Sequence, residues 1–382
     1  MKPLCILFAL LLAAVFMVGP LPVVAAASPS AAVSPSAAVS PSADLKTCAQ
    51  CHAGQAAKWS AAPHARAGLT CLSCHPAESL HAESPAVRYE AALCGKCHAA
   101  EYLEWQKSGH NRPVPYTQEE ILPDLITDCV RCHNVAGYVA VTGSVRAFAG
   151  SKGKVADATS PGVTCAACHD PHGAAAPALL RTGPSSQTCD NCHGDKWQAL
   201  VLAGTGGERY PDSNYASVEK SPHNIGSRCV ACHMARTPGV QAGGHTLVMR
   251  DGQGGLNTGA CAPCHPSARD FNLGGRQAET KALLEAVASA LKERNAGELP
   301  RNQPGKCNEC HRGGTEPFRN DPDGRLNQAF QNYRLFLFDK SLGVHNPAYS
   351  SQLLRESLQH IVSGFAGPAG PRGAEGCCGH QG

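Results

Sequence analysis

The sequence predicts a fold of low regular secondary structure, mainly α-helical, whose interior is filled by something other than side chains. Only 5% of the 382 residues are aromatic, whereas 21 are cysteine. A chain of this length normally buries a larger apolar core than these residues can supply. The net charge is +3, with 33 Lys and Arg against 30 Asp and Glu. We therefore expect no nucleic-acid partner, because such proteins carry a basic excess.

The first residues predict export. Lys2 is followed by an apolar stretch from Leu4 to Val18 and then by small residues up to Ala27. A positive charge, an apolar stretch and small residues, in this order, are typical of a secretory signal peptide. A retained membrane anchor is the alternative. No later apolar stretch is long enough to span a bilayer, so we expect no transmembrane segment once residues 1–27 are removed.

The cysteines predict the cofactor. Eighteen of them form nine Cys-x-x-Cys pairs, and a histidine directly follows every pair. The cysteines are Cys48, Cys51, Cys71, Cys74, Cys94, Cys97, Cys129, Cys132, Cys165, Cys168, Cys189, Cys192, Cys229, Cys232, Cys261, Cys264, Cys307 and Cys310. The histidines are His52, His75, His98, His133, His169, His193, His233, His265 and His311. Cys-x-x-Cys-His is the attachment signature of c-type haem, in which the thiols form thioethers and the imidazole is the proximal iron ligand.

Nine covalently bound haem c groups are therefore predicted, with the polypeptide wrapped around a haem stack. Three other interpretations of the cysteines fit less well. Structural zinc sites do not require a histidine after each pair, and a thioredoxin-like site needs one pair in a β-α-β unit. A disulfide framework, the usual reason for many cysteines in an exported chain, predicts no histidine at these positions.

The spacing and charge of the motifs suggest electron transfer between proteins. Successive motifs begin 23 to 46 residues apart, so neighbouring haems would lie close together, as electron hopping requires. Each ferric haem adds one positive charge at its iron and about two negative charges from its propionates, so nine haems change the net charge from +3 to roughly −6. We expect an acidic holoprotein that docks on basic patches of redox partners.

Nine histidines remain outside the motifs, one for each haem. The candidate distal iron ligands are His64, His81, His110, His172, His223, His245, His345 and His360. The ninth, His380, lies near the C-terminus and is not counted as a ligand; Met234 and Met249 are alternative ligands. Ligation by two histidines predicts low reduction potentials, because an axial methionine would raise them.

The last third of the chain predicts three helices. Apolar residues recur at helical spacing in three sets: Leu284, Val287 and Leu291 within 279–294; Leu326, Phe330, Tyr333 and Leu337; and Leu354, Leu358 and Ile361. Gly297 and Gly343 are expected to end the first two helices, and His345-Asn346-Pro347 to begin the third.

Five segments follow from these patterns. Residues 1–27 are a signal peptide, and 28–45, with a repeated Ser-Pro-Ser-Ala-Ala-Val, form a linker. Residues 46–270 form a haem-binding domain with eight motifs, and 271–363 a helical region with the ninth. Residues 364–382 form a disordered Gly-rich tail, in which Cys377 and Cys378 could cross-link to another molecule or remain free.

From about Leu45 to Gly364 the chain resembles the multihaem c-type cytochromes of respiratory electron transfer. Cys48 to His75, with His64 between the two motifs, is similar to the paired haem units of periplasmic decahaem carriers. Cys165-Ala-Ala-Cys-His-Asp-Pro-His172, and Cys229-Val-Ala-Cys-His-Met234 with His245 downstream, look like segments common across the wider group. Asp339-Lys-Ser-Leu-Gly-Val-His-Asn-Pro-Ala-Tyr349 resembles the C-terminal helical region of the cytochrome c nitrite reductase and hydroxylamine oxidoreductase clan.

The resemblance implies an electron carrier of anaerobic respiration, in the periplasm or exported to the cell surface. Its partners would be a donor such as a membrane quinol dehydrogenase and an acceptor reductase or outer-surface cytochrome; an oligomer is also conceivable. No catalytic residue is predicted. One alternative is a reductase of a small nitrogen or sulfur oxyanion at one five-coordinate haem, although none of the nine motifs ends in the Lys that is typical of the nitrite reductases. Another is a subunit of an extracellular cytochrome filament.

Overall fold

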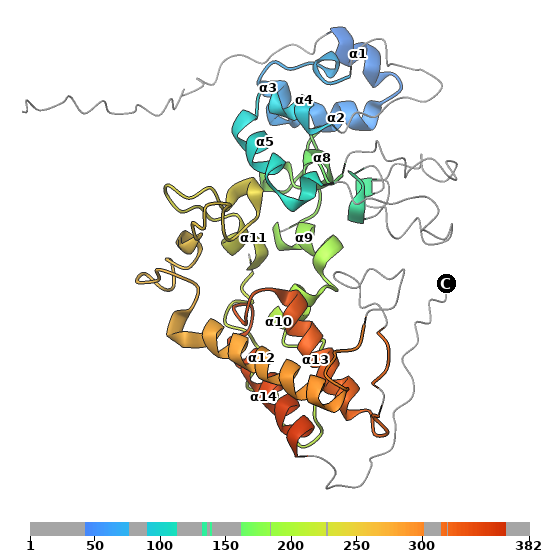
Figure 1. Ribbon diagram of the computed structural model, residues 1–382. Helices are drawn as coiled ribbons and strands as arrows, with labels where there is room; N and C mark the ends of the chain where they lie inside the picture. The colour runs from blue at the N-terminus through green and yellow to red at the C-terminus, as the bar shows by residue number, and fades with distance from the viewer. Residues whose placement is uncertain are drawn as a thin grey trace, which may run out of the picture. The chain divides into compact units, whose positions relative to one another are not determined.

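The structure of the chain is a computed structural model (Figure 1). It describes residues 43–75, 90–112, 132–135, 138–139, 162–183, 185–226, 228–301, 315–318 and 320–363. Some predicted features lie outside these residues: the signal peptide, residues 28–42 of the linker, the tail with Cys377, Cys378 and His380, and His81, Cys129, Cys307, Cys310 and His311.

Short helices joined by irregular segments make up the described residues. The α-helices are α1 (Ala43–Ala49), α2 (Ala53–Ala61), α3 (Pro63–Arg66), α4 (Ala91–Gly95), α5 (Ala99–Gln106), α8 (Cys165–Cys168), α9 (Ser185–His193), α10 (Trp197–Leu202), α11 (Arg228–His233), α12 (Arg276–Arg294), α13 (Arg325–Asp339) and α14 (Pro347–Val362). Single 3-10 turns include η1 (Cys71–Ser73), η3 (Gly109–Asn111), η6 (Pro177–Leu179), η7 (Gly244–Thr246), η8 (Thr258–Ala260) and η9 (Leu273–Gly275).

The predicted fold class, helical with little regular structure, is confirmed. Within the described ranges the backbone pairs only at three isolated β-bridges, and no strand is formed. Helix α1 begins at Ala43, so its first turn overlaps the end of the predicted linker. None of the helices in the described part is both long and apolar enough to cross a membrane.

The haem motifs form single helical turns. In each of five motifs the histidine N–H donates to the carbonyl of the first cysteine; the pairs are His52–Cys48, His75–Cys71, His98–Cys94, His169–Cys165 and His265–Cys261, at 2.7 to 3.0 Å. Residues three apart on a helical turn share one face. A turn of this kind therefore presents both thiols to one side and places the imidazole one step beyond them.

The three predicted C-terminal helices are confirmed, and they enclose an ordinary apolar core. Helices α12, α13 and α14 pack on one another, and α10 packs on α13 (Figure 1). Val287, Leu335 and Leu353 are fully buried among these helices. The third helix begins where the sequence predicted, since Pro347 is its first residue and the Asn346 side chain accepts the Tyr349 N–H.

The buried face of α13 differs from the predicted one. Leu337 is 42% exposed, whereas Leu335 and Phe336 are buried. The prediction from a single apolar stripe assumed that neighbouring elements cover only one side of the helix. Helix α13 instead contacts α10, α12 and α14, so its covered surface is wider and is centred elsewhere.

The buried core of the C-terminal helices gives a stability prediction. We expect Leu353→Ala to lower the free energy of unfolding of this region by about 2 to 5 kcal/mol, because it leaves a cavity where Leu353 is fully buried. Leu337→Ala is the matched control, and its effect should stay within about 0.5 kcal/mol because Leu337 is largely exposed. Denaturant unfolding followed by circular dichroism compares the two. Equal losses would contradict this account of the core.

Candidate functional site

Five pairs of histidine rings lie close together in the described structure, with interplanar angles from 8° to 74°. Each pair joins one motif histidine to one predicted distal ligand. The pairs and their ring-centroid distances are His98–His64 at 6.1 Å, His75–His172 at 5.9 Å, His193–His110 at 6.2 Å, His169–His245 at 6.4 Å and His233–His345 at 6.3 Å. The members of a pair come from different segments of the chain.

These distances suit a metal ion between the two rings. A metal–imidazole bond is about 2 Å long, so two opposed ligating nitrogens lie about 4 Å apart and their ring centroids about 6 Å apart. All five measured separations fall close to this value. Two neutral imidazoles are the donor set of a six-coordinate haem iron. The residues present therefore fit a haem iron at each pair, which the two imidazoles would hold.

Hydrogen bonds at the other ring nitrogen hold the imidazoles in orientation. The Nδ1 atom of a paired histidine donates to a backbone carbonyl in three cases: His64 to Pro171 at 3.1 Å, His169 to Ala178 at 2.6 Å and His233 to Leu247 at 2.8 Å. Carboxylates take this place at His345, with Asp339 at 2.5 Å, and at His172, with Asp170 at 3.3 Å. A proton fixed at Nδ1 leaves Nε2 free to bind a metal, as is usual for metal-ligating histidines.

Burial lowers the pKa of five of the ten paired imidazoles, which favours their neutral form. Desolvation, with a smaller contribution from His193, lowers the pKa of His110 to about 4. Desolvation also lowers the pKa values of His75, His169, His193 and His233. A neutral imidazole is the form that binds a metal ion. At His345 burial is the largest single influence and acts to lower the pKa, but the hydrogen bond to Asp339 and the charges of Asp339 and Cys229 together outweigh it, so the pKa is raised.

A local sequence pattern positions several distal histidines. In three of them, the backbone N–H of the histidine donates to the side chain two residues earlier, at 3.1 to 3.2 Å. The pairs are His110 with Ser108, His172 with Asp170 and His223 with Ser221. Short polar side chains favour such turns because they satisfy a backbone donor locally. The recurrent Ser-x-His and Asp-x-His sequences therefore each form a tight turn with the imidazole at its end.

The His245 loop is built differently. A Cβ atom at Gly243 would lie only 1.7 Å from the Ala235 carbonyl oxygen, and its φ is +80°, so this position requires glycine. The Glu104 carboxylate, on α5, accepts the His245 N–H at 2.9 Å and forms a two-point ion pair with Arg236. Glu104 thus fastens the loop that carries His245 to the helix that precedes His110.

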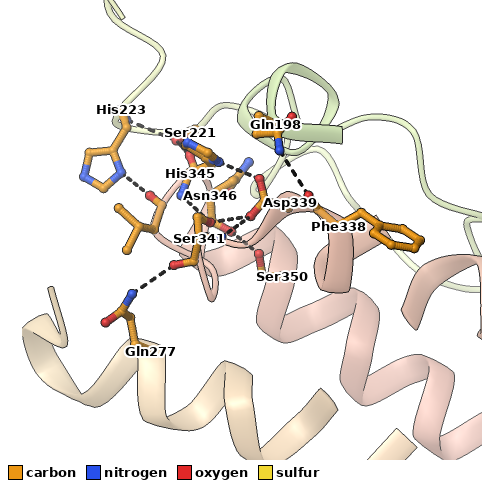
Figure 2. Close-up of polar contacts among 11 residues, drawn as sticks. Gln198, Ser221, His223, Gln277, Phe338, Asp339, Ser341, His345, Asn346 and Ser350 are labelled. Carbon is orange, nitrogen blue, oxygen red and sulfur yellow. Dashed lines mark hydrogen bonds and ion pairs between the residues drawn. The ribbon is translucent and has the colours of Figure 1, made fainter. Parts of the chain in front are cut away.

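Two predicted ligands, His223 and His345, are connected by hydrogen bonds at the start of α14. His223 Nδ1 donates to the Val344 carbonyl at 2.5 Å, and Ser221 Oγ donates to the carbonyl of His345 at 2.5 Å (Figure 2). The rings of His223 and His345 therefore extend from one backbone junction, and His345 faces His233.

Neighbouring motifs touch one another in a defined order. Helix α1, with the first motif, contacts η1 of the second; α4 of the third contacts α8 of the fifth; and α9 of the sixth contacts α11 of the seventh, which contacts η8 beside the eighth. Cys94 lies near Cys165 and Cys74, and Cys232 lies near Cys261. Each of these attachment sites thus lies beside at least one other in space.

Other predicted ligands are described but are not members of these pairs. His52, His133 and His265 are motif histidines outside the five pairs, and His223 is a distal candidate outside them. His360, on α14, stacks on Tyr210 with ring centroids 3.9 Å apart. It borders a small pocket with Asp321 and Arg325, and its role as a distal ligand stays a prediction.

Three carboxylates beside the distal ligands were not predicted from the sequence. They are Glu104, Asp170 and Asp339, and each contacts a distal histidine through its backbone or its ring. Asp170 stands two residues before His172 and could have been recognised from that spacing. Glu104 is distant in sequence from His245, and a turn separates Asp339 from His345. Only the tertiary structure therefore reveals these two carboxylates as neighbours of the histidines.

Comparison with known proteins supports a cytochrome fold. Residues 158–198 match a family described as the doubled CXXCH motif, and this stretch holds the fifth and sixth motifs. The structure is similar to the outer cell wall cytochrome OcwA, with 21% identity, a TM-score of 0.52, and coverage of 77% of this chain and 70% of that one. It is also similar to an undecahaem cytochrome from the S-layer of Carboxydothermus ferrireducens, with 20% identity, a TM-score of 0.48, and coverage of 77% and 50%. No curated protein sequence matches the chain.

The motifs and the likeness to OcwA together show the fold of a multihaem c-type cytochrome that binds haem c covalently. The number of haems and the resemblance to the nitrite reductase clan remain predictions from the sequence.

The angles between paired rings give a spectroscopic prediction. The planes of His64 and His98 cross at 74°, whereas those of His75 and His172 are within 8° of parallel. Parallel imidazoles interact with the same iron d orbital and split the d levels, whereas crossed imidazoles do not. We therefore expect His64→Ala to remove a highly anisotropic low-spin signal from the electron paramagnetic resonance spectrum of the oxidised holoprotein.

His172→Ala is the matched control and should instead remove a rhombic low-spin signal. Loss of the same type of signal in both variants would contradict the ring orientations.

Proposed function

We propose that this chain is an exported electron-transfer cytochrome with nine haem c groups, one at each Cys-x-x-Cys-His motif. Haem c supplies an iron that accepts and releases single electrons. The five histidine pairs are the observation on which this proposal rests, because a protein that fills both axial positions of an iron leaves no position there for a substrate. Such an iron can carry electrons without doing further chemistry.

In this proposal the paired histidines are proximal and distal ligands of the same iron. His64, His110, His172, His245 and His345 serve the third, sixth, second, fifth and seventh motifs respectively. His81, His223 and His360 remain the candidates for other motifs. Acceptors at Nδ1, which are backbone carbonyls at His64 and His233 and a carboxylate at His345, keep these imidazoles in the tautomer that binds through Nε2.

The contacts between motifs suggest the path of the electrons. The first motif contacts the second, the third contacts the fifth, and the sixth contacts the seventh, which lies beside the eighth. We propose that electrons pass along the haems in approximately their order in the sequence, with the fourth motif beside the fifth and sixth. Val135 and Tyr138, just after Cys132, pack against Ala167 of the fifth motif, which supports this position.

The place of action follows from the signal-peptide pattern. We propose that the protein works outside the cytoplasm, in the periplasm or at the cell surface, and takes part in anaerobic respiration. The name of the similar cytochrome OcwA, from an outer cell wall, supports the cell surface. Redox proteins with basic docking patches would be its partners, because the propionates make the loaded chain acidic.

Electron paramagnetic resonance at low temperature tests the carrier function against the reductase alternative. We expect the fully oxidised, haem-loaded protein to give only low-spin ferric signals, unchanged by nitrite, hydroxylamine or sulfite. A high-spin signal of one haem per chain that shifts when one of these compounds is added would instead show an open iron position. That result would replace the electron carrier with a reductase.

A further inference from the structure

Asp339 is buried against a proposed iron ligand. It is the last residue of α13, and its Oδ1 atom accepts the Nδ1–H of His345 at 2.5 Å (Figure 2). The other carboxylate oxygen accepts the hydroxyl of Ser341 and, at 3.3 Å, the Ser341 backbone N–H. The side chain of Asp339 is completely shielded from solvent. A short hydrogen bond to an ionised, buried acceptor is among the strongest that proteins form.

No basic side chain in the described part of the chain balances the charge of Asp339. Among the described residues, none of the Lys or Arg side chains forms an ion pair with Asp339. Its negative charge therefore interacts mainly with the imidazole of His345 and the hydroxyl of Ser341. In a low-dielectric interior such a charge acts much more strongly than at the surface.

The other carboxylates beside distal histidines differ in this respect. Asp170 lies 3.3 Å from His172 Nδ1, but Lys58 and Arg181 lie 3.6 and 3.7 Å from its other oxygen. Glu104 forms its ion pair with Arg236, and its oxygen is 3.7 Å from His245 Nδ1. Of the three, Asp339 has the shortest contact with an imidazole and the least neutralised charge.

We propose that Asp339 lowers the reduction potential of the haem held between His233 and His345, so that this seventh-motif haem is the last of the five paired haems to be reduced. The inference rests on the proposed role of His345 as a distal ligand. A carboxylate that accepts the Nδ1–H makes the imidazole a stronger electron donor to the iron. The same buried negative charge opposes the arrival of an electron. Both effects favour the ferric state.

Asp339 is a positioning residue, because it acts on the iron through His345. The test is a spectroelectrochemical titration of the full haem-loaded protein with Asp339→Asn. Asparagine keeps the shape and can still accept the Nδ1–H, but it removes the charge. We expect one haem's share of the absorbance change to move to higher potential by at least a tenfold change in its equilibrium constant, about 59 mV for one electron.

Two matched variants make the effect specific. Asp170→Asn removes a carboxylate that is shared with Lys58 and Arg181, so its shift should be clearly smaller. Glu285→Gln removes the same charge from a side chain that is 66% exposed on α12, and no haem should shift. Ser341→Ala removes a hydrogen bond to Asp339 and leaves more charge on the oxygen beside His345, so this variant should shift the same component to lower potential.

The inference is overturned if Asp339→Asn leaves every potential unchanged, or if Glu285→Gln produces an equal shift. His345→Ala separates this failure from failure of the proposed function. If that variant gives a high-spin signal of one haem while Asp339→Asn has no effect, only the tuning role is wrong. If it leaves all haems low-spin, His345 is not a ligand and the assignment beneath the inference is wrong. Should Asp339→Asn fail to fold, the Ser341→Ala shift decides the question by its sign.

Discussion

The pairing of two imidazoles about 6 Å apart is the interaction on which most of this structure depends. Each of the five pairs joins segments that are distant in sequence, such as α3 with the third motif and the start of α14 with the seventh. Outside the C-terminal helices, the largest apolar cluster among the described residues holds only Val135, Tyr138, Val139 and Ala167. A core of that size cannot hold some two hundred residues together. In the proposed function, the iron between each histidine pair and the haem faces beside it provide the missing cohesion, so that cofactor binding and folding are coupled.

The C-terminal helices are organised by a different principle. Helices α12, α13 and α14 enclose an apolar core of the ordinary kind, with Val287, Leu335 and Leu353 fully buried. Rigid packing gives the ends of these helices fixed positions. The turn from Asp339 to Asn346 lies at one such end, and it carries His345 and contacts His223 (Figure 2). The helical core thus acts as a scaffold for two of the candidate distal histidines.

Electrostatics can make chemically identical sites unequal. All five pairs present two imidazoles, yet their Nδ1 partners range from neutral carbonyls at His64 and His233 to a buried carboxylate at His345. Hydrogen bonds at this atom are one of the few ways in which a protein can alter an iron whose ligands are otherwise the same. When the haems of a chain have unequal reduction potentials, electron transfer along them has a preferred direction, and electrons at rest are distributed unequally among them. The carboxylates Glu104, Asp170 and Asp339 are therefore as relevant to function as the ligands.

The sequence by itself determined the chemistry and the local structure. The motif Cys-x-x-Cys-His identifies covalent haem, because two thiols three residues apart and an adjacent imidazole are what attachment requires, and it also folds locally as one helical turn. The apolar periodicity located α12, α13 and α14, and Asn346-Pro347 located the start of α14. Counting the spare histidines identified the candidate distal ligands, and five of them face a motif histidine in the structure.

Only the tertiary structure decided which imidazoles face each other, which face of α13 is covered, and which carboxylate lies beside which ligand. His172 follows directly after the fifth motif, yet it faces His75 of the second. The distance between two histidines in the sequence does not predict such a pair, because the rest of the fold brings together segments that are far apart in the chain. Asp339 illustrates the same limit: its proximity to His345 follows from a local turn, but its complete burial and the absence of a described basic partner follow from the packing around it.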